Sequence, residues 1–275
     1  MVKKIIACSD IHIHNLSRQD ECQEMLMKFI NECKKIVDEY GSDSVRIVIA
    51  GDILHNKLDI SSEGYLLASW FFKQLDEVAK TIVIAGNHDL NMRNLSRLDP
   101  MSVIFSLCKF KQVYYLDKEL DYSSGCVKDD NIEWCLYSTF DNFAQPNIPE
   151  TKIKDKDSTY VGLYHGTLQG AKTPVGYTFD NGISANYFEG IDFGILGHIH
   201  KRQCLMNDGV PLVYCGSLIQ QNHGESVTCH GYTLWDVESC TYKEIDIPNE
   251  MYGYYTFSIK KEDDIDNNLE EVVNL

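Results

Sequence analysis

Several features that would place the protein in a special class are absent from its sequence. No stretch approaches the roughly 18 consecutive apolar residues of a membrane-spanning helix, so no membrane partner is expected. The apolar run from Ile5 to Cys8 is too short for a signal peptide. The 10 cysteines form no C-x-x-C pair, which argues against a zinc ribbon and against a redox motif. Reduced thiols in a cytoplasmic protein, or in the host cytoplasm if a virus encodes it, are the simplest interpretation.

Positive charge is scarce. Lysine and arginine together number 25 against 41 aspartates and glutamates, which gives a formal net charge of -16. Proteins that bind a nucleic-acid backbone over a wide surface usually carry a basic patch, so the total argues against such binding by this chain alone. A phosphodiester substrate stays possible, because aspartates that ligate metal count as negative in this sum although the metal offsets them.

Three short apolar runs in the first third of the chain predict buried strands. They run from Lys4 to Asp10, from Arg46 to Asp52 and from Thr81 to Asn87, and each ends in polar residues. Between them, apolar side chains at i, i+3 and i+4 spacing predict helices over 25–40 and 61–79. This alternation implies a parallel sheet with right-handed crossovers.

The later part of the chain predicts short strands with little helix between them. A second, more antiparallel sheet packed on the first is the economical arrangement. The strand-like runs cover 131–140, 160–164, 192–196, 210–215, 229–237 and 241–247. We expect polar loops over 121–130 and 155–157, and one more strand over 254–259 before an acidic tail.

Potential metal ligands stand directly after these predicted strands. The carboxyl ends of parallel strands meet at one edge of a sheet, so such side chains converge on one crevice. His198 and His200 point to the same side if their segment is extended. The residues concerned are Asp10, His12, Asp52, His55, Asn87, His88, Asp89, His165, His198 and His200.

Each group by itself has an ordinary explanation. A single histidine at a strand end is more often hydrogen-bonded or exposed than metal-bound, and aspartate before a turn is commonly a turn residue. The coincidence of all the groups argues otherwise, because only His14, His223 and His230 of the 9 histidines lie outside them. We expect His14 to be a surface residue and assign no role to the other two.

In this order, the motifs Asp10-Ile-His12, Gly51-Asp52, Gly86-Asn87-His88-Asp89, His165 and Gly197-His198-Ile-His200 resemble the signature of the calcineurin-like metallophosphoesterases. The resemblance spans most of the chain. It implies an α/β fold, a four-layer α-β-β-α sandwich of two mixed sheets. It also implies two divalent ions that share one ligand: Asp10, His12, Asp52 and His200 for one ion, and Asp52, Asn87, His165 and His198 for the other. Manganese is the first expectation, with iron, zinc or magnesium as alternatives.

Three features resemble one branch of this family, the double-strand-break repair nucleases of the SbcD type. His55 lies three residues after Asp52, where these nucleases carry a histidine that contacts the substrate phosphate. The segments 165–171 and 214–232 also resemble theirs. The resemblance therefore implies a two-metal DNA nuclease, exonuclease or endonuclease, that acts in DNA end processing, repair or recombination.

The resemblance also implies roles for individual residues. The metals would stabilise the anionic transition state and activate an attacking water. His88 is the candidate for protonating the leaving oxygen, with Asp89 orienting its ring, and His55 would position the phosphate. Three cations are candidates for binding backbone phosphates, although a solvated helix face explains each of them equally well: Lys57, Arg93 and Arg97.

DNA, a second copy of the chain and an SbcC-type ATPase are the partners that the resemblance implies. The dimer would form through helices over 61–79 and near 100–109, and the Trp70-Phe71-Phe72 run fits either a dimer surface or the core. We divide the chain into a metallophosphoesterase (nuclease) domain over 1–247 and the start of a truncated or reduced C-terminal accessory region over 248–275. The latter is short for an ATPase-docking region.

Two other functions stay open. A small-molecule phosphatase or cyclic-nucleotide phosphodiesterase would keep every metal ligand and suits the acidic charge slightly better. A catalytically silent scaffold would usually have lost one ligand or His88, whereas all of these residues are present.

Overall fold

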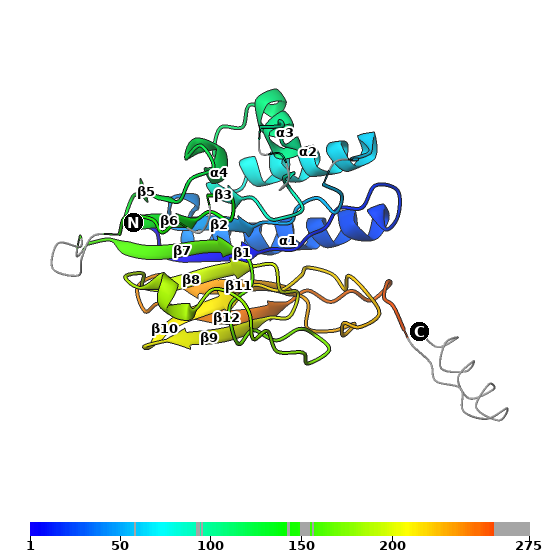
Figure 1. Cartoon of the computed structure of the whole chain (residues 1–275). Helices are drawn as coiled ribbons and strands as arrows, with labels where there is room; N and C mark the ends of the chain where they lie inside the picture. The colour runs from blue at the N-terminus through cyan, green and yellow to red at the C-terminus, as the bar shows by residue number, and fades with distance from the viewer. Residues whose placement is uncertain are drawn as a thin grey trace.

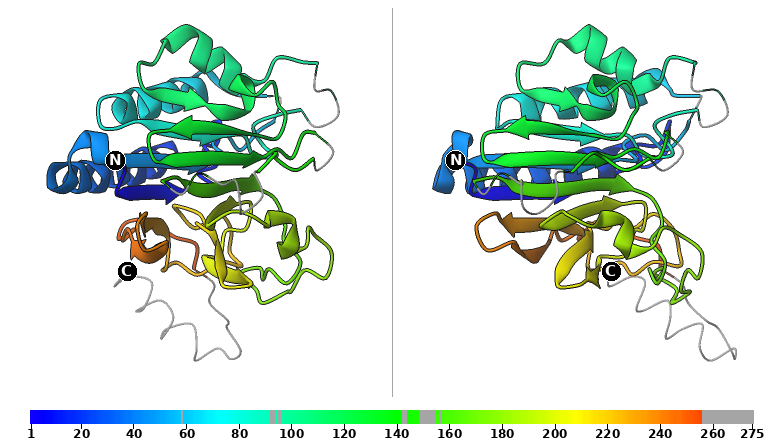
Figure 2. Two further views of the ribbon diagram at one scale, coloured as in Figure 1. Left: turned by 90° about the vertical axis from the view of Figure 1, so that its left-hand side faces the viewer. Right: turned by 60° about the vertical axis from the view of Figure 1, so that its left-hand side comes forward.

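The computed structural model describes residues 1–57, 59–91, 94, 96–141, 144–148, 155 and 157–255. In this part of the chain, two six-stranded sheets pack against each other (Figure 1). In the left view of Figure 2 the blue and cyan helices lie on one side of the strands, and a yellow-green loop segment lies on the other. The predicted α/β fold with two mixed sheets is confirmed.

The first sheet begins with the three strands predicted from the apolar runs. Its six strands, in chain order, are β1 (Lys4–Cys8), β2 (Val45–Ala50), β3 (Thr81–Ile84), β4 (Val113–Tyr115), β11 (Gly231–Asp236) and β12 (Thr241–Asp246). They are arranged as β12-β11-β1-β2-β3-β4, and β1 to β4 are parallel. The expectation that β11 and β12 belong to the second sheet is wrong. β11 pairs antiparallel with β1, and so covers an edge that would otherwise be open.

The second sheet is mostly parallel. Its strands are β5 (Gly125–Asp129), β6 (Ile132–Tyr137), β7 (Thr159–His165), β8 (Phe193–Gly197), β9 (Gln203–Asn207) and β10 (Val210–Tyr214), in the order β5-β6-β7-β8-β10-β9. The expected antiparallel character is wrong for the four central strands and holds only at the two edges. Long connections after β6 and β7 allow parallel crossovers. The loop expected over 121–130 contains β5.

Helices cover the outer face of the first sheet. They are α1 (Gln19–Tyr40), α2 (Ser62–Asp76), α3 (Pro100–Cys108) and the short α4 (Leu116–Glu119), with the 3-10 helix η1 (Ser42–Ser44) after α1. Phe29 on α1 packs with Phe71 and Phe72 on α2, and all three are fully buried. The core interpretation of the aromatic run on α2 is therefore correct for two of its residues, and Trp70 packs at the margin of the core.

The second sheet has a thinner outer layer. Among the described residues this layer consists of the 3-10 helix η2 (Ala185–Phe188) and of loops within 166–192. Phe188 of η2 is fully buried against Tyr137 and Tyr164 of the sheet. Between the two sheets, Phe193 stacks on Trp235 with ring centroids 4.2 Å apart. The core is therefore built in three layers, one between the sheets and one outside each.

Residues 248–255 contact α1 and the segment after β10. The carbonyl of Pro248 accepts a hydrogen bond from Lys28 on α1, and Tyr254 exchanges backbone hydrogen bonds with the Gln220 side chain. Residues 254 and 255 are not in a strand, and 256–259 lie outside the described residues, as does the acidic tail. The domain division at 247 stays a prediction. None of the described helices is both long and apolar enough to span a membrane.

A buried ion pair joins the two sheets at the edge where the parallel strands begin. Asp129 at the end of β5 accepts hydrogen bonds from Nε and an Nη atom of Arg46 on β2, at 2.7 and 3.1 Å. Lys80 and the indole N–H of Trp134 donate to the same carboxylate, at 2.8 and 3.2 Å. Burial opposes the charge, but the bonds from Arg46 and Lys80 outweigh it and lower the pKa of Asp129 to about 2.

We expect Asp129→Ala to lower the free energy of unfolding by about 3 kcal/mol in urea denaturation, because Arg46 is left buried without its partner. A carboxylate whose folded pKa is depressed contributes stability above its unfolded pKa of about 4, and loses it as the pH falls toward the folded pKa. The difference in free energy of unfolding between wild type and variant should therefore shrink as the pH falls from about 6 to about 3.

Asp130→Asn is the matched control, because Asp130 is exposed, forms an ion pair with the N-terminal amine and has a φ angle of 56° that asparagine tolerates. It should lose less than about 1 kcal/mol. Equal losses of stability in the two variants would show that the buried ion pair stabilises the fold no more than the exposed one.

Candidate metal centre

The predicted ligands do converge on one crevice. They follow β1, β2 and β3 in the first sheet and β8 in the second, and His165 is the last residue of β7, so both sheets contribute. Asp10, His12 and Asp52 all have positive φ angles, of 52°, 50° and 53°. Non-glycine residues rarely adopt this conformation, and when they do they cluster at functional sites.

The first group of ligand atoms consists of Asp10, His12 and His200. The two imidazole Nε2 atoms lie 3.2 Å apart, and Oδ1 of Asp10 lies 4.0 and 3.8 Å from them. Two ligands of one ion at about 2.1 Å lie roughly 3.0–3.4 Å apart in octahedral or tetrahedral geometry. The nitrogen separation therefore fits a shared cation.

The second group consists of Asp52, His165 and His198, with Asn87 beside it. Nε2 of His165 is buried, makes no hydrogen bond and lies 3.2 Å from Oδ2 of Asp52. Nδ1 of His198 lies 2.8 Å from Oδ1 of Asn87. A buried ring nitrogen without a hydrogen bond, next to a carboxylate, is a suitable place for a metal ion.

Asp52 lies between the two groups. Its Oδ2 atom is 3.6 Å from Nε2 of His12 and 3.2 Å from Nε2 of His165, while Oδ1 accepts a hydrogen bond from the backbone of His88. Burial opposes its charge, but the imidazoles of His165 and His12 outweigh this and hold the pKa of Asp52 well below its usual range. One carboxylate oxygen thus reaches both groups.

The buried negative charge attracts a cation. Burial alone lowers the pKa of His165, but the carboxylates of Asp52 and Asp10 outweigh this effect and raise it to about 10. Burial lowers the pKa of His198 to about 4, and nearby His165 adds to the effect. The crevice therefore favours either a proton on His165 or a metal ion on the same atoms, since metal binding displaces protons from its ligands.

Hydrogen bonds to the other ring nitrogen orient two of the imidazoles. Nδ1 of His165 donates to the carbonyl of Ala50 at 2.7 Å, and Nδ1 of His200 lies 2.7 Å from Oε1 of Glu225. Such bonds fix the tautomer, so that Nε2 is free to bind a metal. Glu225 is itself buried and accepts bonds from the Gln221 backbone and the Asn222 side chain. Sequence reasoning gave Glu225 no role, although it lies in the segment 214–232 that carries part of the resemblance.

The partner predicted for His88 is wrong. Nδ1 of His88 lies 2.6 Å from the backbone carbonyl of His55, which is the group that orients the ring. The carboxylate of Asp89 is fully buried and accepts backbone hydrogen bonds from Ile53, Leu54 and Gly86. Asp89 therefore holds the loops after β2 and β3 together.

His14 is not the surface residue that the sequence suggested. Its ring stacks on that of His55 with centroids 3.8 Å apart and an interplanar angle of 24°. The segments after β1 and β2 continue to pair, through the bridge between Ile13 and Leu54, and this places the two histidines side by side. Burial lowers the pKa of His55 to about 4, with His14 and His88 adding to the effect, so its ring is neutral near pH 7.

The predicted phosphate-binding cations are only partly described. Lys57 and Arg97 are exposed and line one small cavity of about 60 Å³ together with Asn91. Arg93 lies outside the described residues. The structure therefore brings two of the three cations to one place beside the loop that carries His88.

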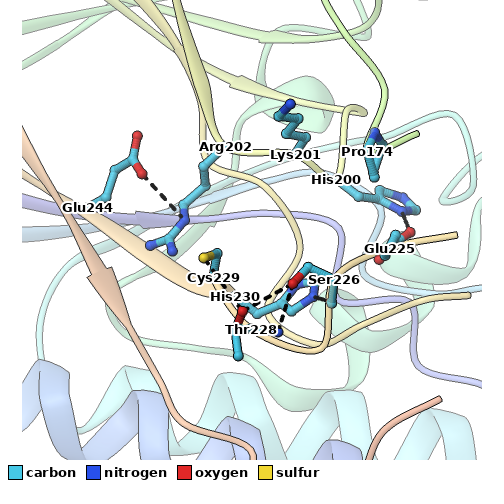
Figure 3. A pocket seen from close by; sticks show the side chains of 10 residues that line it. All are labelled: Pro174, His200, Lys201, Arg202, Glu225, Ser226, Thr228, Cys229, His230 and Glu244. Carbon is cyan, nitrogen blue, oxygen red and sulfur yellow. Dashed lines mark hydrogen bonds and ion pairs between the residues drawn. The ribbon is translucent and has the colours of Figure 1, made fainter. Parts of the chain in front are cut away.

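Two larger cavities adjoin the ligand groups. One, of about 410 Å³, is bordered by His200 and Glu225 of the first group (Figure 3). The other, of about 560 Å³, is bordered by Asn87, His165 and His198 of the second group. Each of the two ligand groups therefore borders a cavity.

The fold and the arrangement of the ligand groups match those of a known superfamily. The chain belongs to the calcineurin-like phosphoesterase superfamily, whose domain matches residues 4–239. The uncharacterized protein R555 of Acanthamoeba polyphaga mimivirus is 38% identical over 265 residues, which cover 94% of this chain. The match covers 19% of R555, so this chain spans about a fifth of the length of that relative.

Solved structures resemble this chain at low sequence identity. An archaeal phosphodiesterase is 14% identical with a TM-score of 0.42, over 89% of this chain and 99% of that chain. A dimetal phosphatase of Danio rerio is 14% identical with a TM-score of 0.48, over 86% of this chain and 93% of that chain.

Glu225→Gln keeps the size of the side chain but removes the carboxylate that orients His200. We expect the affinity for Mn²⁺ to fall about 10- to 100-fold at one of two binding sites, measured by isothermal titration calorimetry on metal-free protein. Glu238→Gln, an exposed change in the turn between β11 and β12, should leave both affinities as in wild type. Unchanged Mn²⁺ binding by a folded Glu225→Gln protein would remove Glu225 from the metal centre.

Proposed function

We propose that this protein is a two-metal-dependent DNA nuclease that hydrolyses phosphodiester bonds in DNA end processing, repair or recombination. The observation that carries the proposal is the position of Asp52, whose Oδ2 atom lies within 3.6 Å of a histidine nitrogen in each ligand group. A carboxylate in this position can bridge two cations. Two adjacent cations suit the in-line displacement at a phosphodiester.

The residues present fit two divalent ions. Asp10, His12, Asp52 and His200 would hold one ion, and Asp52, Asn87, His165 and His198 the other. The nitrogen and oxygen donors suit manganese, our first choice, and also iron, zinc or magnesium. When bound, the metals supply the positive charge that neutralises the phosphate and activates the attacking water.

His88 and His55 would act on the substrate. Since Nδ1 of His88 donates to the His55 carbonyl, the proton for the leaving oxygen would come from Nε2 of the doubly protonated ring, which then becomes neutral. The ring nitrogens of His12, His55 and His88 come within 4.8 Å of one another, so a phosphate at the metal centre lies within reach of both catalytic histidines. His55, neutral and held by the His14 stack, would position the phosphate by hydrogen bonding rather than by charge.

The two large cavities support a diester over a monoester. A phosphate at the metal centre has space on the side of His200 and on the side of His198. A diester carries two organic groups that need such space, whereas a monoester carries one. Lys57 and Arg97, beside the His88 loop, would bind phosphates further along the strand.

A small-molecule phosphatase or cyclic-nucleotide phosphodiesterase is the second candidate. The net charge of -16 favours it, because a small substrate does not require a wide basic surface.

We also propose that two copies of the chain associate through α2 and α3. Phe71 and Phe72 belong to the core, so the apolar contact would come from Leu66 and Leu107, which are 71% and 77% exposed. The SbcC-type ATPase partner is proposed from the resemblance alone. A cytoplasmic location is proposed from the scattered cysteines of the sequence.

Leu66→Glu is expected to shift the protein from dimer to monomer in sedimentation velocity at micromolar concentration, because it places a charge in the apolar contact. Leu16→Glu, at a side chain that is 81% exposed outside these helices, should stay dimeric. A monomeric wild-type protein would overturn this assembly.

His88→Ala should lower kcat for hydrolysis of a labelled DNA duplex and single strand in Mn²⁺ by about 100- to 10,000-fold, because the leaving oxygen loses its proton donor. Hydrolysis of bis-p-nitrophenyl phosphate, measured beside it, separates chemistry from DNA binding. His223→Ala, at an exposed histidine outside the centre, should retain wild-type rates. If the wild type hydrolyses the small ester but does not cleave DNA, the nuclease function is contradicted and the second candidate is favoured.

A further inference from the structure

The cavity beside His200 has the size and position of a substrate subsite. We name it the His200 cavity; its lining includes His200, Lys201, Arg202, Ser226, Thr228 and Glu244. In Figure 3, His200 and Glu225 lie at one end and Glu244 at the other, with Lys201 across from Thr228. Its volume of about 410 Å³ is within the range of about 300–1,000 Å³ for small-molecule sites.

Most charges around the His200 cavity are already paired. The guanidinium of Arg202 contacts the carboxylates of Asp246 and Glu244 and donates to the carbonyl of Ile245. Glu225 is bound to His200. Lys201 is exposed, and none of the ion pairs found among the described residues includes it. Lys201 is therefore the cation of this cavity that can pair with an anionic ligand.

The cavity on the other side of the metal centre has a different lining. It is bordered by His165 and His198 and includes Tyr164 and Ile183, and its exposed lining is more apolar. A phosphodiester bound between the two cavities would place one arm in each. The arm in the His200 cavity meets a cation and the exposed residues Ser226 and Thr228, whose hydroxyl oxygens lie 3.0 Å apart.

We propose that the His200 cavity holds the sugar-phosphate unit next to the scissile bond of a nucleic-acid strand, with Lys201 paired to the neighbouring phosphate. The inference rests on the proposed nuclease function and makes it more specific. A strand with at least two phosphodiesters can contact both the metal centre and Lys201, whereas a simple diester can contact only the metal centre. Because the contact is to the backbone, it carries no base preference.

The test compares a single-stranded oligothymidylate with bis-p-nitrophenyl phosphate, both in Mn²⁺, over a series of salt concentrations. Lys201→Ala should raise KM for the oligonucleotide about fivefold with little change in kcat. The slope of log KM against log salt should become shallower by about 0.7, the value for one phosphate contact on a single strand. The ratio of kcat/KM for the oligonucleotide to that for the small ester should fall by the same factor as KM rises.

Two further variants distinguish the phosphate contact from damage to the neighbouring His200. Lys201→Arg keeps the charge and should restore both KM and the salt slope to near wild type. Lys118→Ala removes an exposed lysine on α4, outside the cavity, and should change neither.

Three results would overturn the inference. An unchanged salt slope and KM in Lys201→Ala, with DNA cleavage intact, removes Lys201 from the substrate and leaves the nuclease standing. Equal loss of activity on both substrates shows damage to the metal centre instead of a lost contact. Turnover of the small ester alone by the wild type overturns the inference and the nuclease together.

Discussion

The metal centre depends on chain segments that approach each other more closely than side chains permit. A Cβ atom at Gly86 would lie 2.1 Å from Oδ1 of Asp52, and a Cβ atom at Gly51 would lie 2.3 Å from Nδ1 of His165. Gly51 also has a φ angle of +88°, which L side chains rarely adopt. These glycines let the loop after β3 and an imidazole from the second sheet close onto the loop after β2. Asp52 reaches both ligand groups only because of this contact, so the glycines of the motifs are as necessary as the ligands.

The convergence of the candidate ligands could be predicted from the sequence because each of them belongs to a short motif at the end of a strand. The strand and the type of side chain are both local features of the sequence. The carboxyl ends of parallel strands meet at one edge of a sheet, and this brings the side chains together. The orientation of the rings could not be predicted. The partner of His88 is a backbone carbonyl, and carbonyls are present at every residue. The partner of His200 is Glu225, which only the folded loop brings near.

The difference between local features and contacts made on folding also explains the errors in the predicted fold. The burial of β1, β2 and β3 on both faces could be predicted from their apolar runs. Sheet membership depends on pairing between distant segments, such as β1 with β11, and apolar pattern alone does not specify a partner. His14 illustrates the point at the site itself. Nothing around it in sequence indicates a function, and its position follows from the pairing of Ile13 with Leu54.

The superfamily chemistry and the choice of substrate reside in different parts of the molecule. The ligands and His88 come from motifs that resemble those of the family, whereas the surrounding cavities and cations are formed by the loops of this chain. The stack of His14 on His55 has a consequence for binding. A histidine held by a neighbouring ring has already lost its rotational freedom when the chain folds. The plane of the His55 ring is therefore fixed before a ligand binds. Ligand binding does not have to order this side chain, so the affinity for the ligand is not lowered by that loss of entropy.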